Sequence, residues 1–196
     1  MDKSLKSIKG KVDNQLKHET LVRDDQKRVV VNMIVQNDKN VLSEFSESKT
    51  PVINTKVAEF IENATASIPA KEHLTLKISS DCIDDEEKGL YSKGIKEYYK
   101  GKYVEVQKSL KESNIISLTL ILASVVLLTA TFFLRNVSAL NFFAEIIDII
   151  SCFFLWEASS ILTFKTRELR NKRNKYLSYI SIKVEYQPLT VKKEKN

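Results

Sequence analysis

A run of 20 residues without a charge, IISLTLILASVVLLTATFFL at positions 115–134, constrains this chain more than any other feature. At about 1.5 Å per helical residue, it matches the ~30 Å hydrocarbon core of a bilayer. A buried helix of a soluble protein is the alternative. However, a chain of 196 residues has little other apolar material to cover such a helix on all sides. We therefore predict a transmembrane helix over residues 115–134.

A second apolar run, over residues 139–164, follows after a turn of four residues. So short a turn brings the second helix back beside the first, which predicts an antiparallel two-helix transmembrane hairpin. Bases dominate both outer flanks, whereas the turn holds only Arg135. The positive-inside bias therefore predicts cytoplasmic termini and an outward-facing turn. The expected anchors at the membrane interfaces are Arg135, Trp156, Lys165, Arg167 and Arg170.

Three carboxylates, Glu145, Asp148 and Glu157, interrupt the second apolar run. Each costs about 2.5 to 3.5 kcal/mol near the bilayer centre and less near an interface. On a helix Glu145 and Asp148 lie about 60° apart, with Glu157 opposite Asp148. We expect Glu145 to snorkel or to meet Arg135, and Asp148 to find hydroxyl partners on the first helix. Helix association, a proton or cation path and simple tolerance near the interfaces all remain open as roles for these acids.

The charge outside the hairpin belongs to a soluble part with its own strands and helices. Three segments read as strands, namely residues 28–36, 74–80 and 179–186. Helices are expected from Asn54 as a cap to Pro69 as the stop, from about Asp84 towards the hairpin, and over residues 165–177. The predicted fold class is α/β, with a small mixed sheet of about three strands and helices, plus the antiparallel transmembrane hairpin.

This reading divides the chain into successive parts. They are a flexible basic segment (1–27), the first part of a cytoplasmic α/β domain (28–113), the hairpin (115–164, with helices 115–134 and 139–164), a helix and strand that complete the soluble domain (165–186), and a flexible basic tail (187–196).

An acidic run after the second predicted strand is the most conspicuous soluble feature, and it comprises Asp81, Asp84, Asp85, Glu86 and Glu87. Acids in a first helical turn suit the helix dipole, and Asp84 with Glu87 predicts a capping box. A calcium loop would need spaced ligands and a turn glycine, which this run lacks. The run is therefore a weak candidate for a metal or active site.

The sequence holds no recognisable catalytic constellation. It has no phosphate-binding glycine loop, nucleophile elbow, zinc motif or paired catalytic carboxylates, so we predict no enzyme activity and no cofactor. The net charge of +6 comes from bases that bracket the apolar block, without the aromatic platforms of a nucleic-acid module, so we expect no nucleic-acid partner.

Three segments together resemble an uncharacterised family of small bacterial membrane proteins. They are PVINTKVAEFIENATASIPAKEHLTLKI, IDDEEKGLYSKGIKEYY and FFLWEASSILTFKTRELRNKRNKYL. The family pairs a small soluble domain with two transmembrane helices and a tryptophan-containing motif, here Trp156, Glu157 and Ala158. The resemblance implies the same architecture and a bacterial inner membrane, and it implies no activity.

Three functions are therefore considered. The leading hypothesis is a non-enzymatic, membrane-anchored interaction or assembly module whose partners are the lipid bilayer and either a second copy or another protein. The alternative is an oligomeric effector or ion- or proton-conducting channel that its cytoplasmic domain gates, with Asp148 on the path. A membrane-tethered enzyme that uses the acidic run ranks last.

Overall fold

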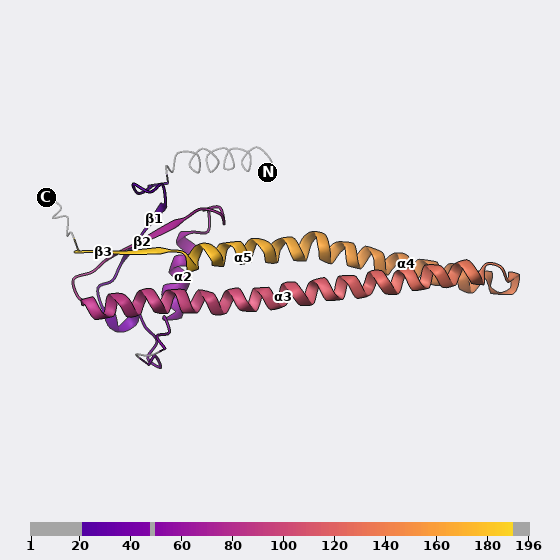
Figure 1. Ribbon diagram of the computed structural model, residues 1–196, viewed down its shortest axis with the longest axis horizontal. Coiled ribbons are helices and arrows are strands. Elements are labelled where there is room, and N and C mark those ends of the chain that lie inside the picture. The colour runs from indigo at the N-terminus through magenta and orange to yellow at the C-terminus, as the bar shows by residue number, and fades with distance from the viewer. Residues whose placement is uncertain (1–20, 48–49, 190–196) are drawn as a thin grey trace, which may run out of the picture. The chain divides into compact units, whose positions relative to one another are not determined.

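The computed structural model describes residues 21–47 and 50–189 (Figure 1). The chain divides into two compact units. Among the described residues, the sheet unit holds 21–47, 50–68, 72–94 and 181–189, and the helical unit holds 69–71 and 95–180. Most of the predicted flexible termini, residues 1–20 and 190–196, lie outside the described residues.

The sheet unit contains three parallel strands in the order β1-β2-β3. Their bounds are β1 Val29–Ile34, β2 Leu74–Ser79 and β3 Lys183–Gln187. The predicted mixed sheet is therefore wrong in strand direction, although about three strands were expected. Helical connections separate these strands in the sequence, and a parallel pair requires such a long crossover.

The third strand begins later than predicted because the preceding helix is longer. The helix α5, Thr166–Ile180, includes Tyr179, which was expected to begin the strand. Tyr179 is 1% exposed within that helix. The alternation of Ile180, Ile182 and Val184 resembles a strand, but Tyr179 and Ile180 belong to the helix, where Tyr179 is buried in the helical unit.

The two faces of the sheet differ in polarity. Strand register places Val31, Leu76 and Val184 side by side on one face, with Met33, Ile78 and Tyr186 in the next row. The opposite face carries rows such as Asn32, Lys77 and Glu185. Leu76 and Ile78 are completely buried, so the apolar face forms the core of the sheet unit.

The helix α2, Thr55–Ala64, covers part of this core with Ala58 and Ile61. Its predicted cap is confirmed, because the Asn54 side chain accepts a hydrogen bond from the Lys56 N–H. The helix ends at Ala64, before the predicted stop at Pro69. The hydroxyl of Thr65 donates to the carbonyl of Ile61 at 2.7 Å, at the position where the helix ends.

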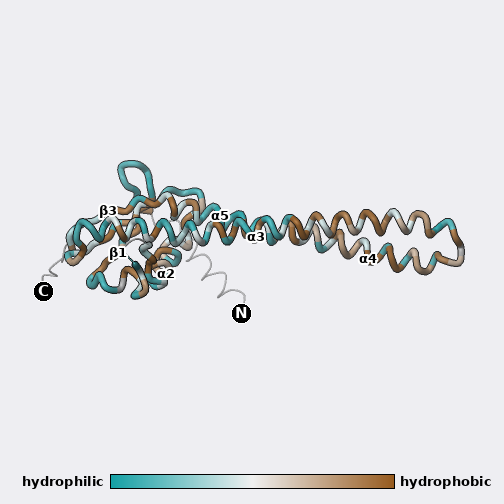
Figure 2. Tube along the Cα trace, turned by 60° about the horizontal axis from the view of Figure 1, so that its bottom comes forward, coloured by the Kyte–Doolittle hydropathy of each residue, from teal (hydrophilic) through white to brown (hydrophobic). Residues whose placement is uncertain are grey.

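Two very long helical stretches make up most of the helical unit, and the first of them begins within the sheet unit. The helix α3, Asp85–Leu134, contains both the predicted soluble helix and the first apolar run. After a short 3-10 turn come α4, Asn141–Ser160, a π-helical segment, Ile161–Lys165, and α5. In Figure 2 the hydrophobic colouring is concentrated over the second half of α3 and over α4. Both stretches are long and apolar enough to cross a membrane.

Two glycines near the start of α3 give a matched pair of predictions. A Cβ atom on Gly94 would lie 3.1 Å from the Ile53 Cγ2 and 3.4 Å from the Pro51 carbonyl oxygen, whereas nothing lies within 4 Å of one on Gly89. We expect Gly94→Val to destabilise the sheet unit by about 1–3 kcal/mol through overpacking. Gly89→Ala should stabilise it by about 0.5–1 kcal/mol through helix propensity.

Unfolding monitored by circular dichroism in mild detergent measures both effects. A Gly94→Val protein as stable as the wild type would show that the loop around Ile53 moves aside freely.

Candidate functional site

A polar cluster surrounds Asp148 of α4. Its two carboxylate oxygens accept hydrogen bonds from different residues: Oδ2 from the Arg135 guanidinium and Oδ1 from the Thr131 hydroxyl, the latter at 3.2 Å. The expected hydroxyl partner of Asp148 is confirmed. Arg135, expected to meet Glu145, forms its ion pair with Asp148 instead. Both carboxyl oxygens of Asp148 are thus engaged by residues of its own chain.

The other two acids of α4 point away from this cluster. Glu145 and Glu157 are both exposed, and neither makes an ion pair with the residues that the structure describes. Asp148 is more buried than these two acids, because it is half-buried. The structure therefore brings together only one of the three predicted acids with the predicted anchor Arg135.

A stripe of small buried residues runs along each apolar helix at intervals of seven. The α3 stripe contains Ser117, Ser124 and Thr131, and the α4 stripe contains Ala144, Ser151 and Ala158. The Ser124 hydroxyl donates to the Ser151 carbonyl oxygen at 2.9 Å, so the two stripes are in direct contact. Small side chains allow close approach of helices in an apolar environment.

The π-helical segment changes the spacing of the second stripe. Thr166, the next buried small residue after Ala158, follows at an interval of eight and is 3% exposed. A π-helical turn accommodates one additional residue. The segment Ile161–Lys165 therefore returns Thr166 to the buried side of the helix.

The remaining predicted anchors lie on the surface of the helical unit. Trp156 is 75% exposed, and Lys165, Arg167 and Arg170 are also exposed. The indole of Trp156 therefore projects from α4 near its carboxyl end.

The acidic run at the start of α3 has mainly structural roles. The predicted capping box is confirmed, because Asp84 accepts from the Glu87 N–H at 2.8 Å and Glu87 accepts from the Asp84 N–H at 3.1 Å. Asp85 is ion-paired with Lys88, which lowers the pKa of that carboxyl. Asp81 accepts from the Leu189 N–H. Glu86 lies in the first turn of α3, where its charge suits the helix dipole.

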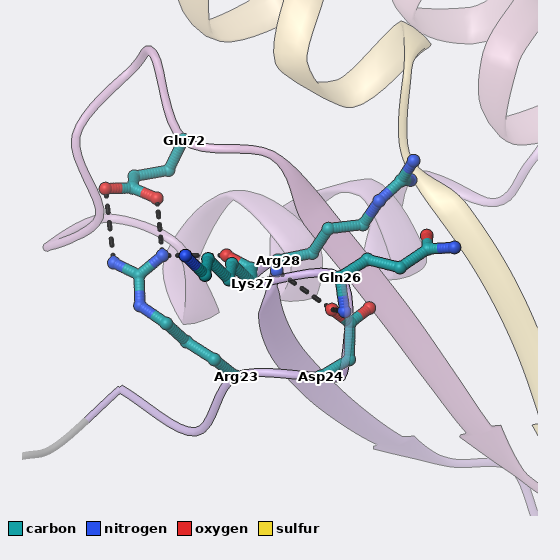
Figure 3. A network of polar contacts seen from close by, with 6 residues as sticks. All are labelled: Arg23, Asp24, Gln26, Lys27, Arg28 and Glu72. Carbon is teal, nitrogen blue, oxygen red and sulfur yellow. Dashed lines mark hydrogen bonds and ion pairs between the residues drawn. The ribbon is translucent and has the colours of Figure 1, made fainter.

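A polar network at the start of β1 was not predicted from the sequence, because residues 21–27 were assigned to the flexible segment. Figure 3 shows Asp24 accepting hydrogen bonds from the turn that precedes β1, and Arg23 paired with Glu72. The buried hydroxyl of Thr75 also donates to Asp24, at 2.7 Å. The only sequence signal is an Asp placed shortly before a strand, as in many turns.

This network predicts an acid-dependent contribution to stability. The hydrogen bond from Thr75 and those from the backbone N–H groups lower the pKa of Asp24 below its ordinary value of 3.8. A carboxyl group with a lowered pKa stabilises the folded state at pH values above its ordinary pKa. This contribution is lost as the pH falls through the folded-state pKa. We expect Asp24→Ala to lower the thermal midpoint clearly at about pH 7 and progressively less below about pH 4.

Asp25→Ala is the matched control, because Asp25 is exposed and has no hydrogen bond or ion pair within the described part of the chain. Equal effects of the two substitutions at neutral pH would contradict the role of the Asp24 network.

An open hollow of 630 Å³ lies at the carboxyl end of β1. Its lining combines apolar side chains, among them the exposed Ile34 and Phe60, with the polar residues Gln36, Asn37, Asn54 and Lys56. The carboxyl ends of parallel strands are where α/β proteins commonly bind ligands. The volume of the hollow lies within the range of typical ligand pockets.

Two tyrosines of the sheet unit have raised pKa values. Burial raises the pKa of Tyr186 to about 12, and burial together with Glu87 raises the pKa of Tyr91. Both phenols therefore stay protonated at neutral pH, and Tyr186 donates to the Lys88 carbonyl oxygen. Within residues 21–47 and 50–189, no group of three or more His, Cys, Asp and Glu side chains is placed to hold a metal ion.

Comparison of the chain with family models, with curated proteins and with solved structures finds no match.

Proposed function

We propose that the protein is an integral membrane protein whose apolar helices form an antiparallel transmembrane hairpin, and that the hairpin anchors a cytoplasmic α/β unit that acts by binding. The exposure of the two apolar helices carries this proposal. Only 17% of the most apolar 18-residue window of α3 is buried, and 11% of the corresponding window in residues 141–180. A core helix of a soluble protein buries most of its surface, so a bilayer is the natural cover for these helices.

The spacing of the small residues supports the antiparallel arrangement. With Ser124 opposite Ser151, as their hydrogen bond requires, an antiparallel pair places Ser117 opposite Ala158 and Thr131 opposite Ala144. Small residues then face small residues at every step of the pair, which permits the close approach typical of transmembrane helices.

The same register places all three acids towards the ends of the spans. Residues 115–134 then lie opposite residues 141–160. Glu157 is about 4–5 Å from the cytoplasmic end, Glu145 about 6 Å from the outer end, and Asp148 about 10 Å from the outer end, at 1.5 Å per residue. Acids near an interface cost far less than central ones, and the deepest of the three is paired with Arg135. These positions favour insertion of the hairpin.

The proposed topology has both termini in the cytoplasm, following the excess of bases on the outer flanks over the single Arg135 in the turn. The resemblance to small bacterial two-span proteins supports a bacterial inner membrane as the location.

Binding is the proposed role of the sheet unit because its hollow is open and presents exposed apolar side chains, with Ile34 64% exposed and Phe60 40% exposed. Exposed apolar side chains of this kind commonly mark sites of protein association. We propose that the protein assembles with itself or with another membrane or cytoplasmic protein through this unit. A conducting oligomer has less support, since the carboxylate of Asp148 is engaged by Arg135 and Thr131.

The two native cysteines test insertion directly, because both are exposed in the protein: Cys82 in the sheet unit and Cys152 on α4. In membrane vesicles with the cytoplasmic face outward, a water-soluble maleimide is expected to label Cys82 at once and Cys152 only after detergent is added. The Cys82→Ser and Cys152→Ser variants assign the signals. Equal labelling of both thiols without detergent would contradict insertion.

Light scattering in mild detergent tests self-assembly. The expected result is a discrete mass above that of the 22.5 kDa monomer, reduced by Ile34→Glu in the hollow. A wild-type monomer at all concentrations would contradict self-assembly, and cross-linking would then be needed to find a different partner.

A further inference from the structure

Cations along the helical unit differ in how they are neutralised. Three lysines farther from the apolar runs form ion pairs: Lys100 with Glu97 at 2.6 Å, Lys102 with Glu105 at 3.6 Å and Lys172 with Glu168 at 2.7 Å. On the outer flanks of the apolar runs, the five nearest cations make no ion pair with any residue that the structure describes, whereas Arg135 in the turn is paired with Asp148. These five, here called the boundary cations, are Lys108, Lys111, Lys165, Arg167 and Arg170.

The two segments that carry the boundary cations have a net positive charge. Residues 108–114 and 165–170 contain these five cations and two acids, Glu112 and Glu168, so the net charge is 5 − 2 = +3. Glu168 is already engaged by Lys172. All five cations are exposed, so their charge faces the surroundings of the helices.

Large apolar side chains adjoin this charge. Phe164 is 73% exposed and precedes Lys165 in the sequence, and Trp156 is 75% exposed two turns earlier. In the register set by Ser124 and Ser151, Lys111 lies within about one helical turn of Phe164 and Arg167. A ligand that contacts this surface therefore meets cations on one side and apolar side chains on the other.

We propose that the boundary cations bind the phosphate headgroups of anionic phospholipids, an inference that rests on the proposed membrane insertion. A lipid satisfies both halves of the surface, because its phosphate pairs with the cations while its acyl chains cover Phe164 and Trp156. A free phosphate ion satisfies only the first half. Arg167 and Arg170 stand three residues apart on one helical face, and guanidinium groups bind phosphate oxygens in a bidentate manner.

Full-length protein in neutral detergent micelles, titrated with fluorescent phosphatidylglycerol or phosphatidylcholine, tests this assignment. We expect a clear preference for phosphatidylglycerol that weakens at high salt. Each base near an anionic surface contributes about fivefold in affinity, the equivalent of about 1 kcal/mol. The Arg167→Gln/Arg170→Gln protein should therefore bind phosphatidylglycerol about 25-fold more weakly, with little change for phosphatidylcholine.

The Lys100→Gln/Lys102→Gln protein is the matched control, because it loses two cations that are already ion-paired. We expect it to bind within about twofold of the wild type. Equal losses in the two double variants would overturn the assignment to the boundary cations and leave only an effect of net charge. An Arg167→Lys/Arg170→Lys protein should keep the preference for the anionic lipid, which guards against misfolding as the cause of the loss.

Two further results would overturn the proposal. One is equal affinity of the wild type for the two lipids, and the other is displacement of phosphatidylglycerol by inorganic phosphate at equal concentration, which would assign a soluble anion to the site. Maleimide protection of Cys152 is measured separately. A protein that inserts but shows no lipid preference contradicts this inference alone, whereas an unprotected Cys152 contradicts the proposed function.

Discussion

Replacing Tyr99 with alanine is expected to destabilise the helical unit by about 3–5 kcal/mol, the range for large aromatic side chains in cores. Tyr99 is fully buried. Its ring centroid lies 4.6 Å from that of Tyr179 and 6.1 Å from that of Tyr176, so α3 and α5 are joined through this one side chain. Truncation removes both ring contacts and leaves a cavity between the helices.

Chemical unfolding monitored by circular dichroism in mild detergent measures this effect. Tyr98→Ala is the matched control, because Tyr98 is only half-buried and its ring contact is with Tyr99. We expect it to cost about 1 kcal/mol or less. Comparable losses for the two substitutions would contradict a specific role for Tyr99, as would a loss below about 1 kcal/mol for Tyr99→Ala.

The ion pair between Arg135 and Asp148 is expected to respond unequally to loss of its two members. Arg135→Ala leaves an unpaired carboxyl group about 10 Å inside the proposed span, so it should lower the stability of the inserted hairpin by about 2.5–3.5 kcal/mol. Asp148→Ala leaves an arginine at the outer boundary, where its long side chain reaches water. We expect a loss of about 1 kcal/mol or less from that change.

A double-mutant cycle in lipid nanodiscs measures the coupling between these residues. The Arg135→Ala/Asp148→Ala protein is expected to be more stable than the Arg135→Ala protein, because the unpaired carboxylate is gone. An additive cycle, or a larger loss for Asp148→Ala than for Arg135→Ala, would contradict the proposed depths of the two groups.

Local patterns in the sequence were sufficient for much of the fold. A nearly continuous apolar run predicted β1, and period-two alternation predicted β2. The uncharged run of 20 residues predicted the apolar part of α3, and the pair of Asp84 and Glu87 predicted the start of that helix. Each of these features depends on residues within a short segment of the chain, so a local sequence pattern is enough to predict it.

Features that depend on distant residues were predicted less well. The parallel direction of β3 follows from a connection of three helices, and its late start follows from the burial of Tyr179 in the helical unit. Arg135 was expected as one of two possible solutions for Glu145, because the spacing within one helix does not show which residues of two helices lie at the same level. The hydrogen bond between Asp24 and Thr75 joins residues 51 positions apart, and no local sequence pattern predicts such a contact.

Measuring which side of the membrane each end of the hairpin faces is the most direct test of the proposed two-span topology. Spheroplasts are treated with a membrane-impermeant maleimide before and after lysis. One protein carries only Cys82, through Cys152→Ser, and another carries Asn136→Cys in the exposed turn without either native cysteine. With both termini in the cytoplasm, we expect labelling of the turn in intact spheroplasts and labelling of Cys82 only after lysis. Labelling of Cys82 in intact spheroplasts, or of the turn only after lysis, would contradict a hairpin with cytoplasmic ends.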